Sequence, residues 1–207
     1  MDAAFEGDPQ DVRAWPRLDP LAPHAEAVAG FADAAAISDL TARLMSQTSR
    51  LYLNKALHAR AEPLMRRTLA IDEASYGATH PEVAIRLNNL AALLQATNRL
   101  GEAEPLMRRA LAIDEASYGA THPNVAIDLN NLARLLQDTN RLGEAEPLMR
   151  RHLVIFLMFQ RDTGHPHPHR DAAINNYAIL LEEMGRTEAE IAGALQAAMR
   201  EAGLDTL

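Results

Sequence analysis

The chain has 207 residues, of which 48% are apolar but only 4% aromatic, so leucine, alanine and methionine must supply most of any core, as in helical proteins. The formal net charge of −8, with arginine interleaved with acidic residues, argues against nucleic-acid binding, and the lack of cysteine excludes disulfides and thiolate chemistry. The longest apolar run has seven residues and the N-terminus does not resemble a signal peptide. We therefore expect a cytoplasmic protein without a membrane span.

The first 37 residues predict a proline-rich lead-in followed by a capping helix. Four prolines lie between positions 9 and 23, and the only tryptophan, Trp15, stands among them. Proline fixes φ and removes a backbone donor, so we expect residues 1–23 to be irregular and tethered by Trp15. The alanine-rich residues 24–36 predict a helix that caps the units that follow.

The dominant feature of the chain is a stretch that it contains almost twice. Residues 61–109 recur as residues 103–151, an offset of 42 residues, and only five of the 49 aligned positions differ. A fixed period in this range is typical of stacked helical repeats, in which each unit buries its apolar face against its neighbours. The differences are Thr68/Ala110, Glu82/Asn124, Arg86/Asp128, Ala92/Arg134 and Ala96/Asp138.

Each regular unit predicts two helices. Residues 81–97 carry apolar side chains at intervals of three and four, the stripe of an amphipathic helix. Thr79 with Glu82 matches a capping box at its start, and Asn98 can end it because asparagine tolerates a left-handed backbone. A second helix is predicted from Leu100 to Ser117 and must pack antiparallel to the first, because only about three residues join them.

The units continue on both sides of the duplicated stretch. Residues 38–56 are a degenerate copy of the first helix, and residues 173–184 copy it again at an offset of 45, because the third unit is three residues longer. A final helix over residues 187–202 is predicted as the terminal cap. The successive helix pairs are then 38–80, 81–122, 123–168 and 169–202, followed by a tail over 203–207.

The large and small residues of a tetratricopeptide repeat are matched in order and spacing by Leu87, Leu90, Ala91, Leu94, Ala103, Met107 and Ala110. The period of 42 residues, with the LNNLA and YGxxHP motifs, resembles the kinesin light chain-like subfamily and its bacterial relatives. This resemblance implies an all-α, right-handed superhelical solenoid of antiparallel helix pairs that binds proteins or peptides. Residues 8–28 are similar to the segment that joins the ATPase core to the repeats in bacterial NB-ARC type regulatory ATPases.

Paired asparagines recur on the first helix of successive units, away from its apolar stripe. An exposed amide can both donate to and accept from the backbone of an extended peptide. In the repeats that this chain resembles, this helix lines a concave groove and the second asparagine contacts the ligand; otherwise the amides brace neighbouring repeats. The candidate groove residues are Asn88, Asn89, Ala92, Gln95, Asn130, Asn131, Arg134, Gln137, Asp138, Asn175 and Asn176.

Four of the five differences between the copies lie on this first helix. At 100° per residue they fall within an arc of about 120° that contains Asn89 and excludes the apolar stripe. Either these positions face solvent and drift freely, or the groove was retuned for a ligand, with Arg134 and Asp138 adding charge. A carboxylate clamp for ligand C-termini is not favoured, because repeats of that kind place lysine where Asn130 stands.

Two further segments allow alternative interpretations. The alternate histidines at 165, 167 and 169 suggest a metal site, but His167 aligns with an ordinary helix start, so we expect no metal. The apolar run 153–159 is either buried under the C-terminal cap or exposed as a partner contact. In the second case, a homodimer would form through Leu153, Ile155, Phe156 and Phe159.

No nucleophile with a base partner, no acid pair in a motif and no glycine-rich phosphate loop is visible, so we expect neither an enzyme nor a cofactor. The sequence predicts a protein–protein interaction scaffold that binds an extended peptide or a partner helix in a concave, asparagine-lined groove. The alternative is a structural or oligomerisation module, or the detached sensor region of a larger signalling ATPase.

Overall fold

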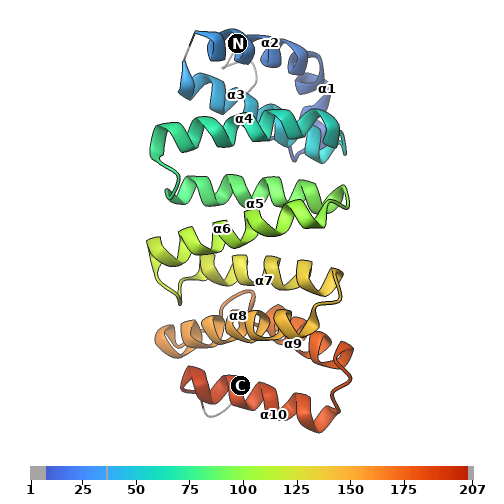
Figure 1. The fold of residues 1–207 in the computed structure, drawn as a ribbon, viewed down its shortest axis with the longest axis vertical. Helices are drawn as coiled ribbons and strands as arrows, with labels where there is room; N and C mark the ends of the chain where they lie inside the picture. Colours follow the sequence, from blue (N-terminus) through green and yellow to red (C-terminus); the bar gives the residue numbers. More distant parts are fainter. Residues whose placement is uncertain (1–7, 36, 205–207) are drawn as a thin grey trace. The chain divides into compact units, whose positions relative to one another are not determined.

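The computed structural model describes residues 8–35 and 37–204 (Figure 1). Every regular element in these residues is a helix, which confirms the predicted all-α class. The chain divides into two compact units, residues 1–106 and 107–207, and the boundary falls inside helix α6, Leu100–Tyr118. Parts of the predicted lead-in and tail, residues 1–7 and 205–207, and position 36 of the predicted capping helix lie outside the described residues. Within the described ranges, no helix is long and apolar enough to cross a membrane.

The lead-in of unit 1 forms short helical turns, where its prolines predicted irregular structure. Pro16, Pro20 and Pro23 each occupy the first turn of a short element, where a missing N–H leaves no intrahelical bond unmade. Trp15 tethers the segment, because its Nε1 donates to the Pro9 carbonyl at 3.0 Å and Lys55 Nζ lies 5.5 Å from its ring centroid. The elements are η2 (Val12–Ala14), α1 (Trp15–Leu18), η3 (Asp19–Leu21) and α2 (Ala22–Ala34).

Three longer helices form the rest of unit 1. They are α3 (Ser38–Asn54), α4 (His58–Tyr76) and α5 (Pro81–Ala96), and α4 packs against both of the others while α2 packs against α3. The predicted apolar stripe of α5 is its core face, because Leu87 and Leu94 have no exposed surface. Asn98 has a φ of 57°, which confirms the predicted left-handed residue after this helix.

The YGATHP motif begins helix α5 with a histidine cap. His80 is the N-cap, and its Nδ1 accepts a hydrogen bond from the Glu82 N–H at 3.2 Å. The His80 ring stacks on Tyr76 with 5.0 Å between centroids, and Gly77 turns the chain between them with a φ of 92°. The capping box predicted at Thr79 is therefore wrong. A capping box occurs instead at Thr187 and Glu190, at the start of α10.

Unit 2 repeats the histidine cap. His122 Nδ1 accepts from the Asn124 N–H at 3.2 Å, and its ring stacks on Tyr118 with 4.6 Å between centroids. We expect His122→Ala to lower the free energy of unfolding by about 1–2 kcal/mol, because an orphan N–H at the helix start loses its acceptor. Urea denaturation followed by circular dichroism measures this loss. His122→Asn keeps an acceptor without the ring, so a loss as large as that of alanine would assign the effect to stacking on Tyr118.

The helices of unit 2 surround an unusually apolar helix. The elements after α6 are α7 (Pro123–Asp138), α8 (Leu142–Thr163), α9 (Arg170–Glu183) and α10 (Glu188–Ala202). Helix α8 packs against α7, α9 and α10, and Leu153, Ile155 and Phe156 are each at most 2% exposed. The burial predicted for the run 153–159 is therefore confirmed and the exposed patch is wrong. Of the four residues proposed for a homodimer, only Phe159 is partly exposed.

The segment between α8 and α9 differs from the predicted helix start. Helix α9 begins at Arg170, two residues after the proline that the alignment placed there. His167 nevertheless keeps the role of the other histidines, because its Nδ1 accepts from the His169 N–H at 3.2 Å. Its ring stacks on Phe156 with 4.2 Å between centroids and 7° between planes. The three additional residues of this unit thus belong to a segment that is anchored on the apolar helix.

Candidate functional site

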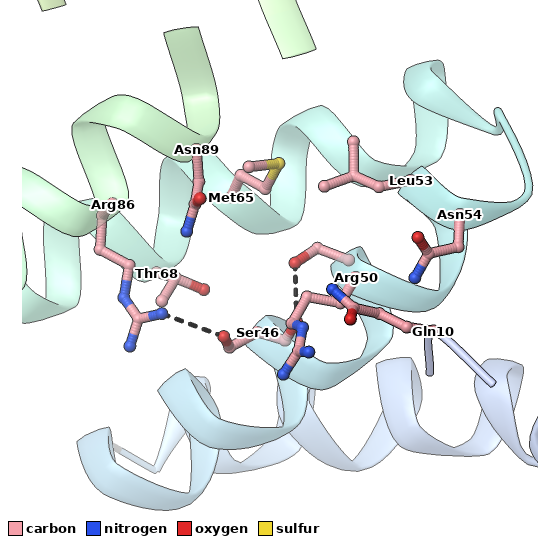
Figure 2. Close-up of a pocket in the computed structure, with 10 residues that line it drawn as sticks. Gln10, Ser46, Arg50, Leu53, Asn54, Met65, Thr68, Arg86 and Asn89 are labelled. Carbon is pink, nitrogen blue, oxygen red and sulfur yellow. Dashed lines mark hydrogen bonds between the residues drawn. The ribbon is translucent and has the colours of Figure 1, made fainter. Parts of the chain in front are cut away.

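Unit 1 contains a hollow of about 160 Å³ between its longer helices (Figure 2). Figure 2 shows Ser46 and Arg50 of α3, Met65 and Thr68 of α4 and Asn89 of α5 around the same space. Donor and acceptor groups predominate in its lining, and no acidic residue takes part. The lining residues of this unit 1 hollow are Gln10, Ser46, Ser49, Arg50, Leu53, Asn54, Met65, Thr68, Arg86 and Asn89.

An ion pair and hydrogen bonds fix one wall of the unit 1 hollow. Arg86 Nε donates to Asp72 Oδ2 at 2.7 Å, while its Nη1 donates to Ser46 Oγ at 3.1 Å. The hydroxyl of Ser49 in turn donates to the Ser46 carbonyl at 2.9 Å. The Asp72 side chain is only 5% exposed, so it holds the arginine from inside the unit. Asn89 is exposed, and its amide is available to a ligand.

Unit 2 contains a hollow of about 300 Å³ on helices of the same kind. Asn176 Nδ2 donates to Asn130 Oδ1 at 3.1 Å, and Gln137 Nε2 donates to Glu183 Oε2 at 3.0 Å. The buried Met149 side chain forms its floor, and the exposed side chain of Ile179 stands at its rim. The lining residues of this unit 2 hollow are Arg134, Gln137, Asp138, Met149, Asn176, Ile179 and Glu183.

The two hollows are copies of one site. Arg50 and Arg134 stand 84 residues apart, which is twice the 42-residue period, and the same separation relates Met65 to Met149. Asn89 and Asn176 stand 87 residues apart, the sum of 42 and the longer offset of 45. Each hollow thus combines an arginine of one first helix, a methionine of the following helix and an asparagine of the next first helix. The arrangement is a property of the repeat.

The predicted groove residues are distributed unequally over this site. Arg134, Gln137, Asp138 and Asn176 line the unit 2 hollow together, and Asn89 lines the unit 1 hollow. The bond between Asn176 and Asn130 supports the bracing interpretation for that pair of amides. The predicted residues that do not line these two hollows are Asn88, Ala92, Gln95, Asn131 and Asn175.

Several lining residues were missed by the sequence interpretation. Arg50 and the two methionines could have been found, because they stand at whole multiples of the period from each other. Ile85 and Ile127 are also on the first-helix face, are the same in both copies and are each 48% exposed. They lie within the arc of positions that differ between the copies. An apolar contact is therefore available beside the amides.

The variable arc is not uniformly exposed, as the helical projection predicted. Ala92 and Ala96 are exposed, and so are Arg134 and Asp138 in the second copy. Asp128, however, is 2% exposed. The prediction of a solvent-facing side chain is therefore wrong at this position, where the first copy has Arg86.

The histidine segment forms an aromatic cluster. The rings of His152 and Phe156 meet edge to face with 4.9 Å between centroids, and Phe159 meets His167 in the same way at 5.0 Å. His152 is buried, and its Nδ1 lies 2.7 Å from the Ala126 carbonyl, so this nitrogen carries the proton. Burial lowers the pKa of His152. Within residues 8–35 and 37–204, no group of three potential ligands is placed to hold a metal ion.

Comparison with known proteins identifies the repeats. The family model described as tetratricopeptide repeat matches residues 40–116 and 85–157, which together make up more than half of the chain. No curated protein matches the chain. Two solved structures are similar to it, and at their low identity they show the fold alone, which confirms the predicted TPR-like solenoid class.

The first of these structures is BtubC (BKLC) from P. vanneervenii, with 20% identity and a TM-score of 0.66 over 80% of this chain. The match spans 65% of BtubC, just under two thirds of its length. The second is a putative kinesin light chain from Podosopora anserina with nearly identical TPR-like repeats, with 20% identity and a TM-score of 0.72. That match covers 98% of this chain and 96% of the other.

Proposed function

The chain belongs to the tetratricopeptide repeat family, and on this premise we propose that it is an interaction scaffold that holds an extended peptide or a partner helix. Helical repeat proteins present extended surfaces to their partners. The observation that carries the proposal is the recurrence of one hollow in both units, each with an arginine, a methionine and an asparagine. The amides contact the peptide backbone, and the exposed isoleucines contact apolar side chains of the ligand.

The similarity of residues 8–28 to the linker of NB-ARC type ATPases supports a setting for this scaffold. In that setting the repeats are the sensor region of a larger signalling ATPase. The lead-in packs through Trp15 and Lys55 onto the first unit, so a change in the repeats can be transmitted to a domain on its N-terminal side.

The test begins with peptides selected from a random display library on the purified chain. Asn89→Ala is expected to weaken the selected peptide about five- to tenfold, because a hydrogen bond to its backbone is worth about 1 kcal/mol. Its melting temperature should stay unchanged, because Asn89 is exposed. Fluorescence polarisation with a labelled peptide measures the affinity, and circular dichroism measures the melting temperature.

Two neighbouring asparagines provide the matched control in unit 2. Asn176 lines the hollow, whereas the exposed Asn175 does not. Asn176→Ala should weaken the peptide and Asn175→Ala should not. If Asn176→Ala lowers only the melting temperature and Asn89→Ala has no effect on affinity, the amides brace the repeats and the proposed function is wrong.

A further inference from the structure

A buried ion pair in unit 1 has no counterpart in the second copy of the repeat. In the first copy, Asp72 of α4 binds Arg86 of α5, with 2.7 Å between Oδ2 and Nε. The two side chains are 5% and 26% exposed, and they line a further hollow of about 190 Å³ that also contains Tyr76 and Glu82. A carboxylate at this depth requires a cation, because the loss of water is costly for an unpaired charge.

The second copy keeps the acid and replaces the arginine with another acid. Asp114 stands at the position of Asp72, and Asp128 stands at the position of Arg86. Both are buried in unit 2, at 5% and 2% exposure. Asp114 Oδ1 is buried and accepts no hydrogen bond from any residue that the structure describes. A carboxylate oxygen therefore stands ready for a donor at the point where the first copy has a guanidinium.

The surroundings of Asp114 do not replace that guanidinium. Burial raises the pKa of Asp114, and the nearby His122 offsets this only in part. His122 is fixed as the cap of α7, with its Nδ1 accepting from the Asn124 N–H and its ring stacked on Tyr118. The imidazole thus serves the helix start and cannot turn its Nδ1 toward the carboxyl group.

We propose that Asp114 and Asp128 accept an arginine side chain of the bound partner, which takes the place that Arg86 has in the first copy. A guanidinium presents several N–H donors in one plane and matches carboxylates better than a point charge does. Because Asp128 lies on the first helix of its unit, the arginine approaches from the face where the peptide is placed. The inference rests on the proposed function and adds the chemistry of one ligand residue.

The first test compares peptides selected from a random display library by the unmodified chain and by Asp128→Arg. The unmodified chain should enrich arginine at one fixed position, and the variant, which carries its own guanidinium, should not. Replacing that arginine with citrulline, which is neutral and nearly the same shape, should weaken the peptide about ten- to a hundredfold. Selected peptides without arginine overturn this inference and leave the proposed function intact, whereas failure to select any peptide overturns both.

A second test does not depend on a selected peptide. N-acetyl-arginine amide and N-acetyl-citrulline amide are titrated into the chain while the carboxyl carbons of aspartate are followed by NMR. The arginine probe should shift the Asp114 signal in a saturable manner, and the citrulline probe should not. Asp72, which is already paired, is the internal control. An equal response to both probes, or a response that persists in Asp128→Arg and in the smaller change Asp128→Asn, overturns the inference.

Discussion

Replacing Phe156 with alanine is expected to lower the free energy of unfolding by about 3–5 kcal/mol, the range for a large aromatic residue in a core. Phe156 is 1% exposed, so the substitution leaves a cavity in α8. It also removes the ring on which His167 stacks at 4.2 Å and which His152 meets edge to face at 4.9 Å. Urea denaturation followed by circular dichroism measures the loss.

Phe159 provides the matched control for this substitution. It lies one helical turn further along α8, is only partly exposed and meets His167 through its ring edge. Phe159→Ala should cost clearly less, because less apolar surface loses its contacts. Equal losses at the two positions would mean that the cluster is held by the histidine segment rather than by burial of α8. A small loss at Phe156 would contradict the core position.

The helices of this fold were predictable because the sequence repeats them. Intervals of three and four residues placed the apolar stripe, and Asn98 marked the end of its helix. The start was misplaced by one residue at His80, because threonine is a common N-cap whereas histidine is not in the usual set. The role of the histidine depends on the ring of Tyr76 and the turn at Gly77, which no local pattern combines.

The candidate site was predictable only in part, because it is assembled from three helices. The asparagines stood out through their period, and Asn89 and Asn176 do line the hollows. Arg50 lies in the degenerate first copy, where the match to the repeat is weak. The burial of Asp128 depends on side-chain length: at the same helical position, the longer Arg86 reaches toward solvent whereas an aspartate stays below the surface.

Removing the cation of the unit 1 ion pair should destabilise the protein strongly. Arg86→Ala leaves the buried Asp72 carboxylate without a partner and removes the bond to Ser46. Loss of one partner of a buried pair costs 3–5 kcal/mol, and because the Arg86 side chain is 26% exposed we expect about 2–3 kcal/mol. Urea denaturation of Arg86→Ala, Asp72→Asn and the double variant gives the coupling between the two side chains.

The sign of that coupling distinguishes an ion pair from independent packing. In the Arg86→Ala background, Asp72→Asn should recover part of the lost stability, because a neutral amide is cheaper to bury than an unpaired carboxylate. Additive losses would mean that the two side chains act independently. The second copy should respond in the opposite direction. There Asp128→Arg supplies the missing guanidinium to Asp114, so the free chain should become more stable. The natural chain thus retains a buried acid that a ligand can neutralise, and binding an arginine should raise its melting temperature while leaving Asp128→Arg unchanged.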